Sequence, residues 1–181
     1  MACLTLAGYS RGCDDSIGGI KKVALFEKSG LDLTGATIVS GVITILTQDN
    51  NYTGYTYDFL KWNSNWVEPI LGDGLLANAS WQPQLNLIFK KTSATLRNEI
   101  YELSKGETCA IVQDQNDEYW FLGFQNGLDL IASPGFSSGN VSTDPNGATI
   151  LLQGLEAIPS YSIDISSEST VDARILALFG F

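Results

Sequence analysis

The stretch TCAIVQDQNDEYWFLGF at residues 108–124 decides the fold class of this chain. Two segments rich in β-branched and aromatic residues, 108–114 and 118–124, flank a polar Gln-Asn-Asp triplet at 115–117. Segments of this composition on either side of a short polar turn are typical of a β-hairpin. We therefore expect two antiparallel strands at this place in the chain.

The segments on both sides of this hairpin also have strand patterns. Residues 23–26 are apolar on both faces, as in a fully buried strand. Residues 37–47 are rich in β-branched residues, and residues 55–59 alternate aromatic with polar side chains, which is the period of a half-buried strand. We interpret residues 52–91 as an antiparallel meander with a long glycine-bearing connection. The remaining strand-like segments are 85–89, 127–132, 149–155 and 161–165.

One segment has the pattern of a helix. Leu96, Ile100 and Leu103 recur at helical spacing, and Ser93 before them is a residue type that caps helix N-termini through its hydroxyl. About nine short strands separated by turns favour a sandwich or a barrel. The sequence therefore predicts a mostly β protein, an antiparallel β-sandwich or barrel with one flanking α-helix at about residues 93–104.

The length of 181 residues suits one domain. We expect an N-terminal arm at residues 1–19, a β-domain at 20–165 and a C-terminal arm at 166–181. No stretch approaches the ~18 apolar residues of a membrane span, so we expect no membrane partner.

The composition argues against catalysis and metal binding. The chain contains no histidine, which is the commonest general base and a common metal ligand. Its three cysteines, Cys3, Cys13 and Cys109, are well separated and do not form a zinc-binding pattern. We therefore predict no enzyme activity, no catalytic residue, no cofactor and no metal site.

The charge of the chain limits its contact with nucleic acid. Lysine and arginine number 10 and aspartate and glutamate number 20, which gives a formal net charge of −10. Binding to phosphates over a broad surface needs clustered cations. An acidic chain can still surround DNA without holding it.

Three tryptophans and the apolar C-terminus are the candidate contact residues. Aromatic anchors are frequent in subunit interfaces, and exposed apolar patches usually mark contact surfaces. A place in the core and a carbohydrate-binding platform are the alternatives for the tryptophans. The predicted interface residues are Trp62, Trp66, Trp81, Ile175, Phe179 and Phe181.

An ordered series of short blocks over about residues 1–165 resembles a known protein family. In sequence order the blocks are Met1-Ala2-Cys3, then Arg11, Cys13, Asp14 and Ser16, Gly18 to Lys21, Tyr55 to Leu60 with Asn63 to Trp66, Gln84 to Leu87 with Lys90-Lys91, Leu96 to Leu103, Ile111 to Asp114, Tyr119 to Gly123, Gly127 to Asp129, Asp144 to Gly147 and Gly154 to Pro159. Together they resemble the tail tube or major tail structural proteins of bacteriophages that infect Bacteroidetes, crAss-like phages included. The tail from residue 166 and the loop at 72–82 depart from that pattern.

The resemblance implies a structural virion protein. Such a subunit assembles in the host cytoplasm into homo-oligomeric rings, hexameric or dodecameric. The rings form a tail tube or tail barrel together with other phage tail proteins. DNA passes through this conduit only as non-specific cargo. The alternative hypothesis is a β-sandwich binding module of a phage tail that holds a receptor or a glycan.

Overall fold

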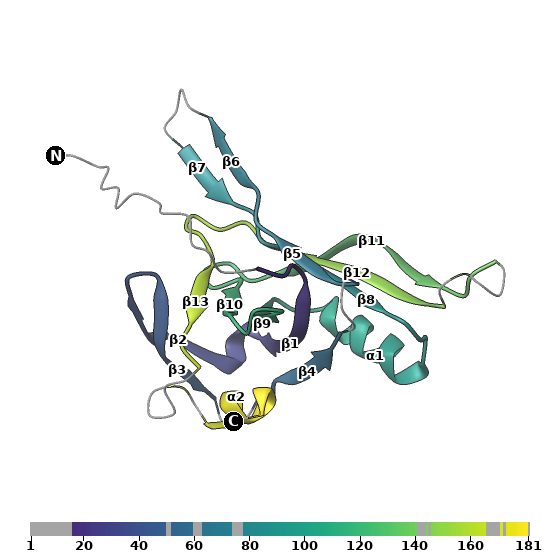
Figure 1. Cartoon of the computed structure of the whole chain (residues 1–181), viewed down its shortest axis with the longest axis horizontal. Coiled ribbons are helices and arrows are strands. Elements are labelled where there is room, and N and C mark those ends of the chain that lie inside the picture. Colours follow the sequence, from purple (N-terminus) through teal and green to yellow (C-terminus); the bar gives the residue numbers. More distant parts are fainter. Residues whose placement is uncertain are drawn as a thin grey trace.

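The hairpin predicted from residues 108–124 lies at the centre of the molecule (Figure 1). The structure is a computed structural model that describes residues 16–49, 52–59, 63–73, 78–140, 144, 146–165, 171 and 173–180. In it, β9 (Thr108–Asp114) pairs antiparallel with β10 (Tyr119–Leu122). Asp117 in the connecting turn has a φ of 62°, a conformation that aspartate tolerates better than most residues. The hairpin prediction is confirmed.

Seven of the described strands form the larger sheet. All of its neighbouring pairs are antiparallel except β13 and β3, which run parallel. A short 3-10 turn, Lys28–Gly30, joins β1 to β2. In spatial order the strands are β2 (Leu31–Val39), β3 (Val42–Gln48), β13 (Tyr161–Ile163), β10, β9, β1 (Ile20–Glu27) and β4 (Tyr55–Asp58).

A second sheet and a helix cover one face of the larger sheet. The helix α1 (Ala94–Leu103) contributes Ile100 to the core between the sheets, with Leu96 and Leu103 packed beside it. Alternate residues of β1, Val23 and Leu25, point into the same core. This arrangement buries apolar faces from both sheets, as in a β-sandwich. The strands of the second sheet are, in order, β11 (Asp129–Ser137), β12 (Gly147–Gln153), β8 (Gln84–Phe89) and β5 (Asn65–Val67).

The opposite face of the larger sheet has a core of its own. Ala24 and Phe26 of β1 point into it, because successive side chains of a strand face opposite sides. The helix α2 (Ala173–Phe179) packs here and contributes Ile175, Leu176 and Phe179. The larger sheet therefore forms a wall between two apolar cores.

A two-stranded hairpin projects from this body (Figure 1). It consists of β6 (Ile70–Asp73) and β7 (Asn78–Trp81), which pair antiparallel as a separate sheet. It leaves the body next to β5 and carries its strands away from both larger sheets.

The prediction of a mostly β fold with a helix near residues 93–104 is confirmed. The fold is sandwich-like and not a closed barrel, since β2 and β4 remain as open edges of the larger sheet. The helix begins after Ser93, whose hydroxyl accepts a hydrogen bond from the backbone N–H of Leu96. A second helix, α2, was not predicted.

Residues 37–47, rich in β-branched residues, lie in β2 and β3, and Ser40 and Gly41, with φ values of 52° and 84°, form a tight turn between the two strands. One local expectation was wrong: residues 52–91 are not one meander. The strands of that segment divide among three sheets: β4 joins the larger sheet, β5 and β8 join the second, and β6 pairs with β7.

Candidate assembly surface

The structure places the predicted tryptophans at the side of the molecule that carries the hairpin. Trp66 lies on β5, half-buried, with its ring centroid 5.5 Å from that of Trp120. Trp81 ends β7 and is also half-buried. Neither is an open aromatic platform. Trp62 lies outside the described residues.

Two of the three predicted C-terminal contact residues belong to the interior of the chain. Ile175 is fully buried and Phe179 is 8% exposed, and both pack in the core that α2 covers. The ring of Phe179 lies 5.3 Å from that of Tyr119, measured between centroids. In this structure the two side chains stabilise the monomer. Phe181 lies outside the described residues.

A short backbone pairing fastens the projecting hairpin at its base. The backbone N–H of Trp81 donates to the carbonyl of Glu156 over 2.8 Å, and the N–H of Glu156 donates to the carbonyl of Trp81 over 2.7 Å. The N–H of Gln82 donates to the carbonyl of Pro69 across the hairpin. These bonds fix the direction in which the hairpin leaves the body.

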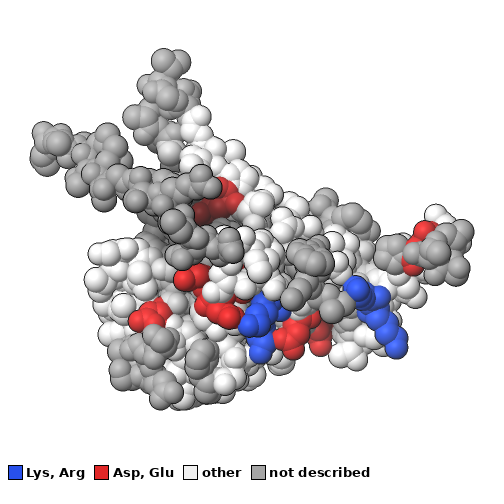
Figure 2. All heavy atoms as spheres, viewed as in Figure 1, with Lys and Arg blue, Asp and Glu red and all other residues white. Residues whose placement is uncertain are grey.

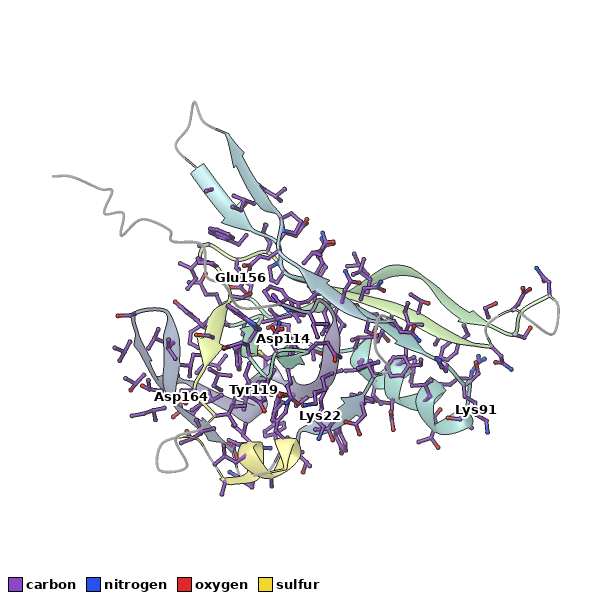
Figure 3. The ribbon with its side chains drawn as sticks, viewed as in Figure 1. Lys22, Lys91, Asp114, Tyr119, Glu156 and Asp164 are labelled. Atoms are coloured by element: carbon purple, nitrogen blue, oxygen red, sulfur yellow. The ribbon has the colours of Figure 1, made fainter. Side chains whose placement is uncertain are left out.

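The side chain of Glu156 strengthens this attachment (Figure 3). It is 3% exposed, and its two carboxylate oxygens accept hydrogen bonds from the backbone N–H groups of Gln125 and Asn126, over 2.9 and 3.0 Å. Burial raises the pKa of this carboxyl above its ordinary value, while the two N–H donors and the charge of Lys28 oppose the rise. The residue thus ties the hairpin base to the loop between β10 and β11.

Large apolar side chains are exposed around the base of the hairpin. They are Val67, Ile70, Leu71 and Leu155, which we call the hairpin-base patch, and their exposed fractions are 45%, 60%, 44% and 52%. Ile70 and Leu71 are neighbours on β6 and therefore lie on opposite faces of the ribbon. Both stay exposed because, among the described strands, β6 and β7 pair with each other and no larger sheet covers them.

Sequence reasoning selected Trp81 at this hairpin but missed the patch. Ile70 and Leu71 precede Gly72-Asp73-Gly74, a turn-forming composition flanked by apolar residues. That pattern is a hairpin signal, although in the structure Gly72 and Asp73 still belong to β6. The exposure of Leu155 had no such signal, because it depends on the pairing of Glu156 with Trp81, which lies far away in the chain.

Acidic side chains dominate the charged groups on the face drawn in Figure 2. Asp117 pairs with Lys21 over 2.6 Å, and this hydrogen bond holds the pKa of the Asp117 carboxyl below its ordinary value. Asp114 accepts from the backbone N–H groups of Asn116 and Glu118. Asp114 therefore stabilises the β9–β10 turn itself, and Asp117 ties the turn to β1.

The described residues offer little for catalysis or metal binding. No group of three or more histidine, cysteine, aspartate or glutamate side chains among them is placed to hold a metal ion. The Sγ of Cys109 lies 3.0 Å from the carbonyl oxygen of Gly123, and burial raises the pKa of this thiol to about 12. Such a thiol remains protonated and is a poor nucleophile.

No helix in the described part of the chain has the length and apolar character needed to cross a bilayer. No model of a protein family, no curated protein and no solved structure matches the chain.

Proposed function

We propose that this chain is a structural subunit of a bacteriophage tail. It assembles with copies of itself into rings, and the rings build the tail tube or tail barrel through which the genome passes. The subunit belongs to the virion and assembles in the host cytoplasm beside other tail proteins. The sandwich-like fold with a flanking helix agrees with what the sequence resemblance implies.

The observation that carries this proposal is the hairpin-base patch. Four large apolar side chains stand exposed at the root of a hairpin that projects from the body. Exposed apolar surface of this kind usually marks a contact with another molecule. Among the described strands, β6 and β7 pair only with each other, so their outer edges can pair with a strand of another chain.

A second copy of the chain is the partner that suits this surface. The hairpin reaches away from its own body, so it can dock on a different surface of a neighbouring copy. A contact between two different surfaces of identical subunits is head-to-tail, and such contacts close into rings when the rotation divides a circle. Stacked rings form a tube.

The acidic character of the chain agrees with a conduit for DNA. With a net charge of −10, a ring of copies presents a strong negative field. Such a field repels the phosphates of passing DNA, so the genome moves without binding to the wall.

Replacement of the patch residues by a charged residue tests the proposal. For the wild-type chain we expect rings or tubes with an open centre in negative stain, and a mass that rises with concentration in light scattering. Ile70→Asp combined with Leu71→Asp removes apolar contact area and places buried charge in the interface. We expect the concentration needed for half-assembly to rise about tenfold or more.

Val39→Asp is the matched control. Val39 is the last residue of β2, it is 56% exposed, and it is not part of the patch. We expect this variant to assemble as the wild type does. A wild-type chain that stays monomeric at every concentration contradicts the proposal. Saturable binding of a glycan by that monomer would favour the receptor-binding or glycan-binding module instead.

A further inference from the structure

Arg174 donates to the backbone carbonyls of Gln48 and Asp49, and the other cations of the described residues fall into two groups. The first group forms ion pairs, with N···O distances between 2.6 and 3.7 Å, and consists of Lys21, Lys22, Lys28 and Lys105. For Lys90, Lys91 and Arg97, no carboxylate of the described residues lies within ion-pair distance. In a chain with twice as many acidic as basic residues, cations without such a partner stand out.

These three cations gather at one end of the molecule. Lys90 and Lys91 follow β8 directly and precede α1, and both are exposed. Arg97 lies on the first part of α1, with its guanidinium carbon 4.9 Å from the centre of the Phe136 ring. Figure 3 places Lys91 beside α1, and Figure 2 shows basic atoms in that region. We call Lys90, Lys91 and Arg97 the basic end.

A complementary surface lies at the turn between β1 and β2. A hollow of about 520 Å³ there is lined by Glu27, Asp32 and Glu107 among others. Its one lysine, Lys28, is occupied by an ion pair with Glu107 over 3.2 Å. The hollow therefore presents Glu27 and Asp32 without a facing cation from the described part of the chain.

Neutral donors hold both of these carboxylates in place. Asp32 accepts from the hydroxyl of Thr34 and from the backbone N–H of Gly35, each over 2.9 Å. These bonds, the one from Gly35 above all, keep the pKa of Asp32 below its ordinary value. Glu27 accepts from the hydroxyl of Ser29 over 2.8 Å. Asp32 is thus ionised and fixed in position before any partner arrives.

We propose that the basic end of one copy docks against the carboxylates of the β1–β2 hollow on the next copy. The inference rests on the proposed function, because it identifies two surfaces that join successive subunits. The two surfaces differ, so the contact is head-to-tail and is compatible with ring closure or with the stacking of rings. Charge complementarity of this kind sets the register and speeds association, and salt screens it.

Charge reversal on each surface separately tests the contact. One variant carries Lys90→Glu and Lys91→Glu, and the other carries Glu27→Lys and Asp32→Asn, which keeps an acceptor for Thr34 and Gly35. Each variant alone places like charges in the contact. We expect each to need about tenfold or more higher concentration for half-assembly than the wild type, by light scattering.

An equimolar mixture of the two variants makes the test specific. In a mixture, the reversed basic end of one variant meets the reversed hollow of the other, and the two native surfaces meet as well. We expect the mixture to assemble near the wild-type concentration in an alternating order. General damage to either variant would not be repaired by mixing.

The matched control reverses another Lys-Lys pair. Lys21→Glu with Lys22→Glu gives the same change in net charge but lies outside the basic end, and circular dichroism verifies that all variants are folded. We expect this control to assemble far better than the Lys90→Glu, Lys91→Glu variant. If the wild type forms rings and both reversed surfaces assemble unchanged, the docking proposal is wrong while the proposed function stands. A wild type that never assembles overturns both.

The same wild-type and Lys90→Glu, Lys91→Glu chains are also titrated with duplex DNA at low salt. Binding that the reversal abolishes, with assembly unchanged, would assign the basic end to nucleic acid and overturn the docking proposal.

Discussion

Glu156 connects three parts of the chain, which are its own segment, the hairpin base and the loop between β10 and β11. Its peptide unit pairs with Trp81 at the hairpin base, and its carboxylate accepts from the backbone of Gln125 and Asn126. Burial raises the pKa of this carboxyl, with Lys28 lowering it and Glu68 raising it. A carboxyl whose pKa is higher in the folded state than in the unfolded state stabilises the fold at low pH. That contribution is lost as the pH rises through the folded pKa.

The effect of the substitution Glu156→Gln on the free energy of unfolding therefore depends on pH. The glutamine is neutral at every pH, so it lacks the loss of stability that ionisation of the buried carboxyl brings. We expect the stability of the variant relative to wild type to improve as the pH rises from about 4 to about 7, around the ordinary glutamate pKa. Urea unfolding of both proteins at several pH values measures this difference. A constant difference would mean that Glu156 titrates normally.

At the level of helices and strands, structure that depends on neighbouring residues could be predicted from the sequence. Contacts between distant segments of the chain could not. The helix α1 was predictable because Ser93 and the spacing of Leu96 and Ile100 lie within one short segment. The contact of Trp66 with Trp120 was not predictable, because it joins strands of different sheets. For the same reason the sequence did not predict that Ile175 and Phe179 pack in the chain's own core, as they do on α2.

The buried side of helix α2 should contribute strongly to the stability of the chain. Ile175→Ala removes a fully buried side chain and leaves a cavity, so we expect a loss of about 2–5 kcal/mol in the free energy of unfolding. Ala177→Ser, on the exposed side of the same helix, is the control and should change stability little. Urea titrations compare the two. Unchanged stability of the Ile175 variant together with weaker assembly would assign α2 to a subunit contact.

At the scale of the whole molecule, the larger sheet belongs to both cores. Ile111 of β9 faces the core that α2 covers, and Leu122 of β10 faces the core beneath the second sheet. Both side chains are fully buried. The same hydrogen-bonded strands support both cores. Loss of packing in one core therefore disturbs the sheet against which the other core packs.

We therefore expect the described body to unfold as one cooperative unit. Ile111→Ala and Leu122→Ala should each cost about 2–5 kcal/mol, although they act on opposite faces. In both variants, tryptophan fluorescence and far-ultraviolet circular dichroism should follow a single coincident transition. Separate transitions, with one variant shifting only one of them, would show that the cores fold independently.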